Sequence, residues 1–192
     1  MKDIKGTKTE INVLTAFAGE SQARNRYTFY AHQAQKDGFI FVRDVFNETA
    51  NQESAHAKRL FSFLQGGTAT ITGTFPAGVI ADTYHNLIES ANGEHEEYDV
   101  MYPQFADIAT QEGFIEIATT MRNIATAEAF HERRFRQLAE MIKNNTMFSA
   151  DKPVVWRCLN CGELITAKDA PKACPVCLHP TAFFERLDWS FV

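Results

Sequence analysis

Two short segments of the chain repeat a pair of side chains that can bind a metal ion. Glu53 and His56 lie three residues apart, and Glu128 and His131 repeat that spacing. On a helix, residues three apart are neighbours on one face, so a single ion can reach both side chains. Either pair alone is weak support for a metal site, because charged residues on helices are usually exposed.

A glutamate about one helix length before each pair strengthens the prediction. Glu20 lies 33 residues before Glu53, and Glu94 lies 34 residues before Glu128. Both halves of the chain therefore carry the same pattern, which predicts two similar metal positions. Four glutamates and two histidines from four helices are the ligand set of di-iron and di-manganese carboxylate bundles. Without cations, burying these carboxylates would cost several kcal/mol each.

The oxygen-rich ligands favour iron or manganese, since a structural zinc site prefers thiolate and histidine. Glu97, three residues after Glu94, is a further carboxylate that the repeat does not require. Two tyrosines lie at helical spacing from the ligands: Tyr27 is seven residues after Glu20, and Tyr102 is eight residues after Glu94. Either hydroxyl could donate to a ligand carboxylate or simply pack in the core.

The four cysteines form two C-x-x-C pairs, Cys158 with Cys161 and Cys174 with Cys177, separated by twelve residues. Four thiols this close together favour a metal over disulfides. The spacing is typical of tetrahedral coordination of zinc or of a single iron, and it does not choose between them. Zinc would make the tail a structural ribbon and iron would make it a one-electron carrier. The neighbouring carboxylate site favours iron.

Length and charge exclude several classes of protein. A chain of 192 residues can form one sizeable domain and a small appendage. The net charge of −5 and the lack of a long basic block argue against a nucleic-acid partner. The polar N-terminus and the lack of a long apolar run argue against a signal peptide and a membrane span. We therefore expect a cytoplasmic protein.

The ligands must be positioned by helices, and four segments have apolar residues at helical spacing. The expected helices are 9–35, 41–65, a third capped by Asp82 and ending at Glu112, and a fourth over about 114–144. Pro103 lies inside the third and is expected to kink or break it. The Gly- and Thr-rich stretch 68–78 is long enough to cross between non-adjacent helices.

Four long helices with one long connection predict a mainly α fold, a ferritin-like four-helix bundle. The predicted bundle domain covers residues 1–147 and holds the di-iron site. A linker over 145–153 leads to a small rubredoxin-like four-cysteine metal domain over 153–192. This tail is too short to be stable without a metal.

With both sites placed, the sequence closely resembles the rubrerythrin family over essentially its full length. The shared segments are 18–24 (Ala-Gly-Glu-Ser-Gln-Ala-Arg), 53–57, 75–78 (Phe-Pro-Ala-Gly), 93–98, 128–131 and the two cysteine pairs. The resemblance implies that Glu97 joins the di-iron ligands and that Glu53 and Glu128 bridge the two irons. It also implies that His56 replaces Glu97 at one iron when the site is reduced.

The resemblance further implies a peroxidase that reduces hydrogen peroxide to water. Electrons would come from NAD(P)H through a reductase or a rubredoxin, and then through the four-cysteine iron. A homodimer or higher homo-oligomer, arranged head to tail, and a role in oxidative-stress defence are also implied. Glu97, His56, Tyr27 and Tyr102 are the candidate catalytic residues, the tyrosines or a carboxylic acid delivering protons.

Two other functions stay open on the sequence alone. A ferritin-like protein could use a similar site to oxidise iron with dioxygen. A structural or regulatory protein could hold zinc in both sites, since four-thiolate sites accept zinc readily.

Overall fold

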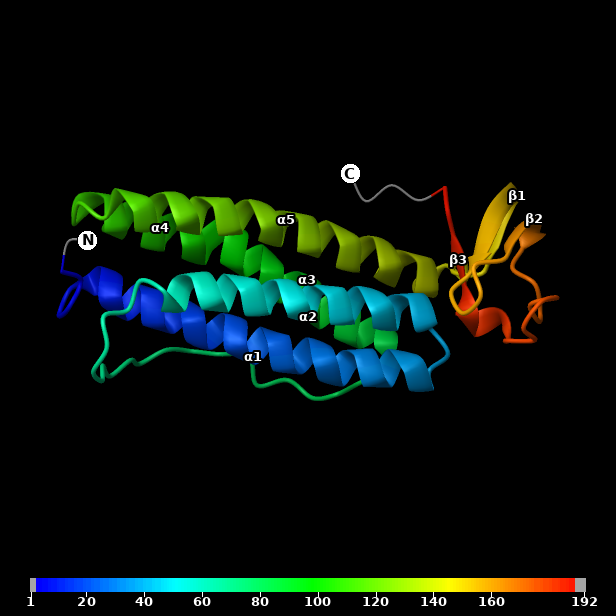
Figure 1. The fold of residues 1–192 in the computed structure, drawn as a ribbon, viewed down its shortest axis with the longest axis horizontal. Helices are drawn as coiled ribbons and strands as arrows, with labels where there is room; N and C mark the ends of the chain where they lie inside the picture. The colour runs from blue at the N-terminus through cyan, green and yellow to red at the C-terminus, as the bar shows by residue number, and fades with distance from the viewer. Residues whose placement is uncertain (1–2, 189–192) are drawn as a thin grey trace.

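The computed structural model describes residues 3–188, which form a bundle of six helical segments followed by a small sheet with one 3-10 turn. The helical segments are α1 (Lys8–Lys36), α2 (Ile40–Phe61), α3 (Thr83–Glu96), η1 (Glu97–Met101), α4 (Tyr102–Gln111) and α5 (Ile115–Lys143). The segments α3, η1 and α4 follow one another without a gap and act as one long helix of a four-helix bundle (Figure 1). The predicted fold class is confirmed.

Local signals in the sequence fix where two of these helices begin. The Thr7 side chain accepts a hydrogen bond from the Glu10 amide at 3.1 Å, which caps α1. Asp82 accepts from the His85 amide at 3.0 Å and caps α3, as predicted. The predicted end of the second helix at residue 65 is wrong, because tighter turns at Phe63 and Leu64 already end α2 at Phe61.

The connection from α2 to α3 runs back along the length of α1 (Figure 1). The amide of Gln22 donates to the carbonyl of Pro76 at 3.0 Å, and the Thr83 amide donates to Asp37 at 2.9 Å. This crossover lets α3 start at the same end of the bundle as α2. The bundle then pairs α1 with α2, and α3 and α4 with α5.

The hydrophobic core of the bundle is divided into two clusters. The tail-side cluster comprises Ala23, Tyr27, Tyr30, Ala31, Ala34, Val42, Val45, Phe46, Ala50, Leu87, Ala91, Phe135, Leu138, Ala139 and Met147. The distal cluster comprises Ile4, Val13, Ala16, Leu60, Phe63, Tyr102, Ala106, Ala109, Phe114, Ile117, Ala118, Met121 and Ile124. Between these clusters, four buried glutamates form a polar layer, and apolar packing on both sides shields it from water.

A π-helical turn, η1, replaces the kink or break expected at Pro103. The Tyr102 amide donates to the carbonyl of Glu97, five residues earlier, and Pro103 follows in the first turn of α4. In a regular α-helix, the proline ring would clash with the carbonyl four residues earlier, and a wider turn before the proline avoids this clash. The helix therefore continues and contains one extra residue in this turn.

The tail is a three-stranded antiparallel sheet in the order β2-β1-β3 (Figure 1). Its strands are β1 (Ser149–Cys158), β2 (Leu164–Asp169) and β3 (Phe184–Arg186), with a 3-10 turn, η2 (Thr181–Phe183), before β3. The strand β1 begins four residues before the predicted tail domain, whose last residues, 189–192, lie outside the described part. Phe148 joins the two domains by stacking on Phe39 with ring centroids 6.0 Å apart.

No helix within residues 3–188 is long and apolar enough to cross a membrane.

Candidate metal centres

Six predicted ligands meet inside the bundle, one or two from each of its four helices. They are Glu20 on α1, Glu53 and His56 on α2, Glu94 on α3, and Glu128 and His131 on α5. Their donor atoms form two groups, Glu20-Glu53-His56-Glu128 and Glu53-Glu94-Glu128-His131, each within 4.8 Å. Because Glu53 and Glu128 belong to both groups, they lie where bridging carboxylates of a two-metal site would lie.

The imidazole of His131 faces the second group through its Nδ1 atom. This nitrogen lies 2.7 Å from Glu128 Oε2, 3.0 Å from Glu53 Oε1 and 3.6 Å from Glu94 Oε2. On the other side of the ring, Nε2 donates to Gln52 Oε1 at 2.9 Å. The hydrogen bond at Nε2 leaves Nδ1 as the nitrogen that is free to bind a metal.

His56 faces the first group in the same way. Its Nδ1 lies 2.9 Å from Glu128 Oε1, 3.1 Å from Glu53 Oε2 and 3.8 Å from Glu20 Oε2. The two imidazole rings lie 6.0 Å apart, inclined at 26°. The histidines thus occupy matching positions on α2 and α5, as the sequence repeat predicts.

Orphaned ligand atoms show that these residues fit a pair of cations. Buried and without a hydrogen bond are Glu20 Oε2, Glu53 Oε1, Glu94 Oε2, both carboxylate oxygens of Glu128, and His131 Nδ1. Buried polar atoms are nearly always paired, so six orphaned atoms in one place point to a missing partner. Their chemistry, five oxygens and one imidazole nitrogen, suits iron or manganese.

Without cations, burial and mutual repulsion shift the pKa values of the carboxyl groups. Burial, followed by the charge of Glu53, raises the pKa of Glu94 to about 8. Burial likewise raises the pKa of Glu20 well above its usual range. Burial opposes ionisation of Glu53 too, but the close imidazoles of His131 and His56 outweigh it and lower the pKa of Glu53. The carboxyl groups of this cluster can therefore all be ionised only when positive charge lies nearby.

The histidines supply that positive charge when protonated. Burial disfavours the imidazolium of His131, but the carboxylates of Glu128 and Glu53, 2.7 and 3.0 Å from Nδ1, raise its pKa to about 12. The pKa of His56 is raised as well, against burial, by Glu128, Glu20 and Glu53. Protons on the imidazoles thus take the place that metal ions would occupy, and metal binding must displace them.

Both predicted tyrosines donate hydrogen bonds to ligand carboxylates. The Tyr27 hydroxyl donates to Glu94 Oε1, and the Tyr102 hydroxyl donates to Glu20 Oε1. Each tyrosine therefore donates a hydrogen bond to the glutamate in the other half of the sequence repeat. Burial, then the adjacent glutamate, raises the pKa of each hydroxyl, so both keep their protons.

The π turn accounts for the unequal tyrosine spacing in the two halves. Tyr27 follows its glutamate by seven residues and Tyr102 by eight, and the extra residue is taken up in η1. Glu97 is the first residue of that turn, so the additional carboxylate comes from the segment where the two halves differ. This link between Pro103, the π turn and Glu97 was not predicted from the sequence.

Glu97 lies outside both groups of candidate ligands. Its pKa is raised by burial and then by the charges of Glu94, Glu128 and Glu53, so its carboxyl lies close to the cluster. The positive charge of Arg26 acts in the opposite direction and lowers the pKa of Glu97. The guanidinium of Arg26 lies 5.8 Å from the centre of the Tyr27 ring, and its Nε and Nη1 are buried without a hydrogen bond.

Sequence reasoning missed Gln52 and Arg26. Both are polar residues directly beside a residue that the repeat singles out, Glu53 and Tyr27. A neighbour in sequence points about 100° away on a helix, so neither was expected to contact the site. Their long side chains reach back to the cluster from a neighbouring face.

The four cysteines also meet as predicted. Their sulfur atoms lie within 4.8 Å of one another, with 3.7 Å between Cys158 and Cys177 and 3.5 Å between Cys161 and Cys174. None forms a disulfide. Sulfurs at the corners of a tetrahedron with bonds of about 2.3 Å lie about 3.8 Å apart, so the cluster fits one metal ion. The backbone amide of His179 lowers the pKa of Cys177 to about 6.

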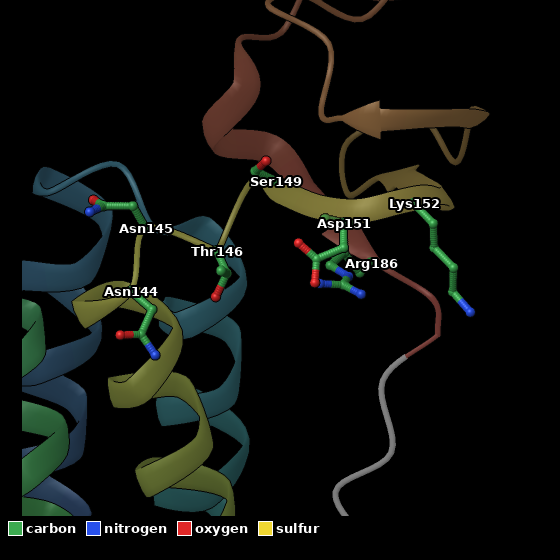
Figure 2. Close-up of a pocket in the computed structure, with 8 residues that line it drawn as sticks. Asn144, Asn145, Thr146, Ser149, Asp151, Lys152 and Arg186 are labelled. Carbon is green, nitrogen blue, oxygen red and sulfur yellow. The ribbon is translucent and has the colours of Figure 1, made fainter.

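One cavity lies away from both centres, at the junction of the two domains (Figure 2). It has a volume of about 410 Å³ and lies between the end of α5, at Asn144 to Thr146, and the start of β1, with Arg186 beside it. It contains no residue of either metal-ligand cluster.

Comparison with known proteins matches both centres to one family. The family model described as rubrerythrin matches residues 12–139, and the model described as the rubrerythrin rubredoxin-like domain matches residues 156–185. Rubrerythrin from Nitratidesulfovibrio vulgaris is 56% identical over 187 residues, which cover 97% of this chain and 98% of the relative. Rubrerythrin from Porphyromonas gingivalis is 52% identical over 190 residues, covering 99% and 95%.

A solved structure shares the whole fold as well. Fully reduced, all-ferrous nigerythrin matches with a TM-score of 0.64 at 28% identity, over 96% of this chain and 89% of that chain. Bundle and tail therefore occur together in that protein too.

Proposed function

The chain belongs to the rubrerythrin family, and we propose that it is a peroxidase that reduces hydrogen peroxide to water at a di-iron site. The observation that carries the proposal is the set of orphaned ligand atoms shared by two overlapping groups in the bundle. Oxygen ligands with a minority of imidazole suit a metal that changes oxidation state. A four-thiolate site in the same chain supplies a second centre through which electrons can enter.

Seven side chains would hold the two irons. We assign Glu53 and Glu128 as bridging ligands, because only they belong to both groups. Glu20 and His56 would complete one position, and Glu94 and His131 the other. Glu97, which lies beside the cluster in the π turn, would alternate with His56 at the first position, as neutral imidazole suits Fe(II) and carboxylate suits Fe(III). In this structure His56 belongs to the first group of candidate ligands and Glu97 does not.

Reduction of hydrogen peroxide to two waters needs two electrons and two protons. Irons held by the seven side chains would supply the two electrons that cleavage of the O–O bond requires. The protein supplies the protons. The hydroxyls of Tyr27 and Tyr102 remain protonated and already point at ligand carboxylates. The raised pKa of Glu97 also suits a carboxyl group that holds a proton and can deliver it.

The surroundings of the site protect this chemistry from water. The tail-side and distal clusters close the polar layer from both ends, and the side chains of Glu53 and Glu128 are 1% and 0% exposed. The side chain of His56 is the most open of the six, at 17%. A small substrate such as peroxide would enter on that side, whereas a larger substrate would be excluded.

We further propose that the tail carries iron and passes electrons from an NAD(P)H-dependent reductase or a rubredoxin to the bundle. The exposed Cys161 and partly exposed Cys177 place this centre at the surface, where a donor can approach. Assembly into a homodimer or higher oligomer would bring one chain's tail near another chain's bundle. We also propose that this activity serves defence against peroxide in the cytoplasm.

The test is consumption of peroxide by anaerobically purified protein with NAD(P)H and a reductase. We expect turnover that depends on both centres, so Glu128→Gln and Cys174→Ser should each abolish it. Glu140→Gln, which changes an exposed carboxylate on the same helix, should not. Dioxygen consumption on addition of Fe(II), without peroxide turnover, would mean an iron-oxidising protein instead. A colourless protein containing only zinc would contradict both functions.

A further inference from the structure

The two histidines of the bundle site differ on the side that faces away from the carboxylates. The Nε2–H of His131 donates to Gln52 Oε1 at 2.9 Å. Within residues 3–188, the Nε2 atom of His56 has no such partner, since the polar contacts of His56 are all at Nδ1. The exposures of the two side chains differ accordingly, at 3% for His131 and 17% for His56.

The sequence repeat explains the difference. Gln52 directly precedes Glu53 on α2, and it reaches across to the histidine of α5. The equivalent bond in the other half would join His56 on α2 to the residue directly before Glu128 on α5. That residue is Ala127, which has no polar side chain. One half of an otherwise matched site therefore lacks the hydrogen-bond acceptor that the other half has.

We propose that Gln52 is a positioning residue that fixes the ring of His131 on its metal, and that Ala127 is the reason why His56 is held less firmly. This inference rests on the proposed metal site. A ligand histidine whose second nitrogen donates a hydrogen bond has its tautomer and its ring orientation set. Without that bond, an imidazole can rotate away from the metal at lower cost.

The consequence is a division of roles between residues that look equivalent in sequence. His131 serves as a permanent ligand, and His56 occupies the position at which a ligand can be exchanged. Loss of the supporting partner of a ligand histidine typically costs 10–100-fold in metal affinity. We therefore expect the two metal positions to differ in affinity, and the difference to depend on residues 52 and 127 rather than on the ligands themselves.

The experiment uses the full-length protein loaded with Co(II), in which the ring N–H protons of ligand histidines give strongly shifted NMR signals. In the wild type we expect the His131 signal to persist in D2O and the His56 signal to exchange quickly. Gln52→Leu should make the His131 signal exchange quickly and weaken one Co(II) by about 10–100-fold. Gln52→Glu keeps an acceptor and should restore both properties.

Two further variants complete the design. Gln33→Leu removes a glutamine whose amide donates to Asp37 at the end of α1, and it should change neither signal. Ala127→Gln should slow exchange at His56. If the His131 signal exchanges equally fast in the wild type and in Gln52→Leu, the role of Gln52 is wrong. If Ala127→Gln leaves His56 unchanged, the role of Ala127 is wrong. Absence of any shifted histidine signal would instead overturn the metal site itself.

Discussion

The two metal-ligand clusters of this chain are built in opposite ways. In the bundle, the ligands come from four helices, and the four glutamates that line the site are at most 2% exposed. In the tail, the ligands come from two tight turns beside short strands, and one of the four cysteines is exposed. The glutamate cluster is therefore enclosed by the helices and their apolar core. The cysteine cluster lies near the surface of a domain that has little other core.

The apolar clusters show what this difference means for stability. The bundle has 15 and 13 buried residues in its two clusters, whereas the tail has 7, two of which are the ligands Cys158 and Cys174. Domains with so small a core usually need a metal or a disulfide. The bundle should therefore keep its fold without metal and lose only its chemistry. The tail should lose both.

The largest expected effect is loss of the tail structure on removal of its metal. Cys174→Ser, or a chelator that strips the wild-type tail, should unfold β1 to β3, because metal binding to such sites contributes about 10 kcal/mol or more to folding. The bundle should remain helical. Hydrogen exchange of the strand amides measures this directly, and continued protection in Cys174→Ser would show that the tail does not depend on metal.

The next effect concerns a bridging carboxylate of the bundle. Glu128→Ala removes a ligand from both metal positions, so peroxide turnover should fall by at least about 1000-fold. Thermal stability of the metal-free protein should fall, because two buried imidazoles lose their nearest carboxylate, but the bundle should remain folded. Glu140→Ala on the same helix is the control. Unfolding of the metal-free Glu128→Ala bundle would contradict the independence of fold and site.

A smaller effect is expected at Glu97, the carboxylate outside both ligand groups. Glu97→Ala should leave the metal content of bundle and tail unchanged, because His56 still holds the first position. It should slow peroxide turnover by about 100-fold, as expected for loss of a proton-transfer group. Metal analysis together with steady-state turnover distinguishes this from Glu128→Ala. Turnover equal to that of the wild type would remove Glu97 from the site.

The smallest effect is a pH dependence that only the metal-free bundle should show. The pKa of Glu94 rises from 4.5 to about 8 on folding. The folded state therefore binds a proton that the unfolded state releases between these values, and stability must fall as pH rises through that range. The pKa of His131 is raised from 6.5 to about 12, so this histidine also makes folding stability fall as pH rises above 6.5. Glu53 has a lowered pKa, and it opposes this trend only below pH 4.5.

Calorimetry of the metal-free protein at pH 5 and pH 8 tests this dependence. The Tm of the bundle should be lower at pH 8, by about 3 °C for each 1 kcal/mol of stability lost. Glu94→Gln cannot titrate and should show a smaller difference. With metal bound, the trend should disappear, because cations replace the protons. A Tm of the metal-free bundle that increases between these pH values would contradict the burial of Glu94 as an acid.

Most of the bundle and its ligands could be predicted from the sequence because each follows from a periodic signal. Helical spacing of apolar residues located the helices, and the repeated Glu and Glu-x-x-His pattern located six side chains that meet inside the bundle. The cysteine spacing located the second centre. These features are local, so they are visible in the chain before it folds.

The features that were missed depend on contacts between helices or on backbone geometry. Pro103 signals a disturbance, but the choice of a π turn over a kink depends on packing of Tyr102 in the distal cluster. The roles of Gln52 and Arg26 depend on which neighbouring helix each side chain reaches. The early end of α2 was hidden because Phe63 is buried in the core although it follows the helix.

Iron content per chain, measured on protein purified without oxygen, tests the central claim most directly. Two irons in the carboxylate site and one in the thiolate site give a predicted value of about three, falling to about one in Glu128→Ala and about two in Cys174→Ser. A wild-type value of one that is lost entirely in Cys174→Ser would mean that the buried glutamates hold no metal.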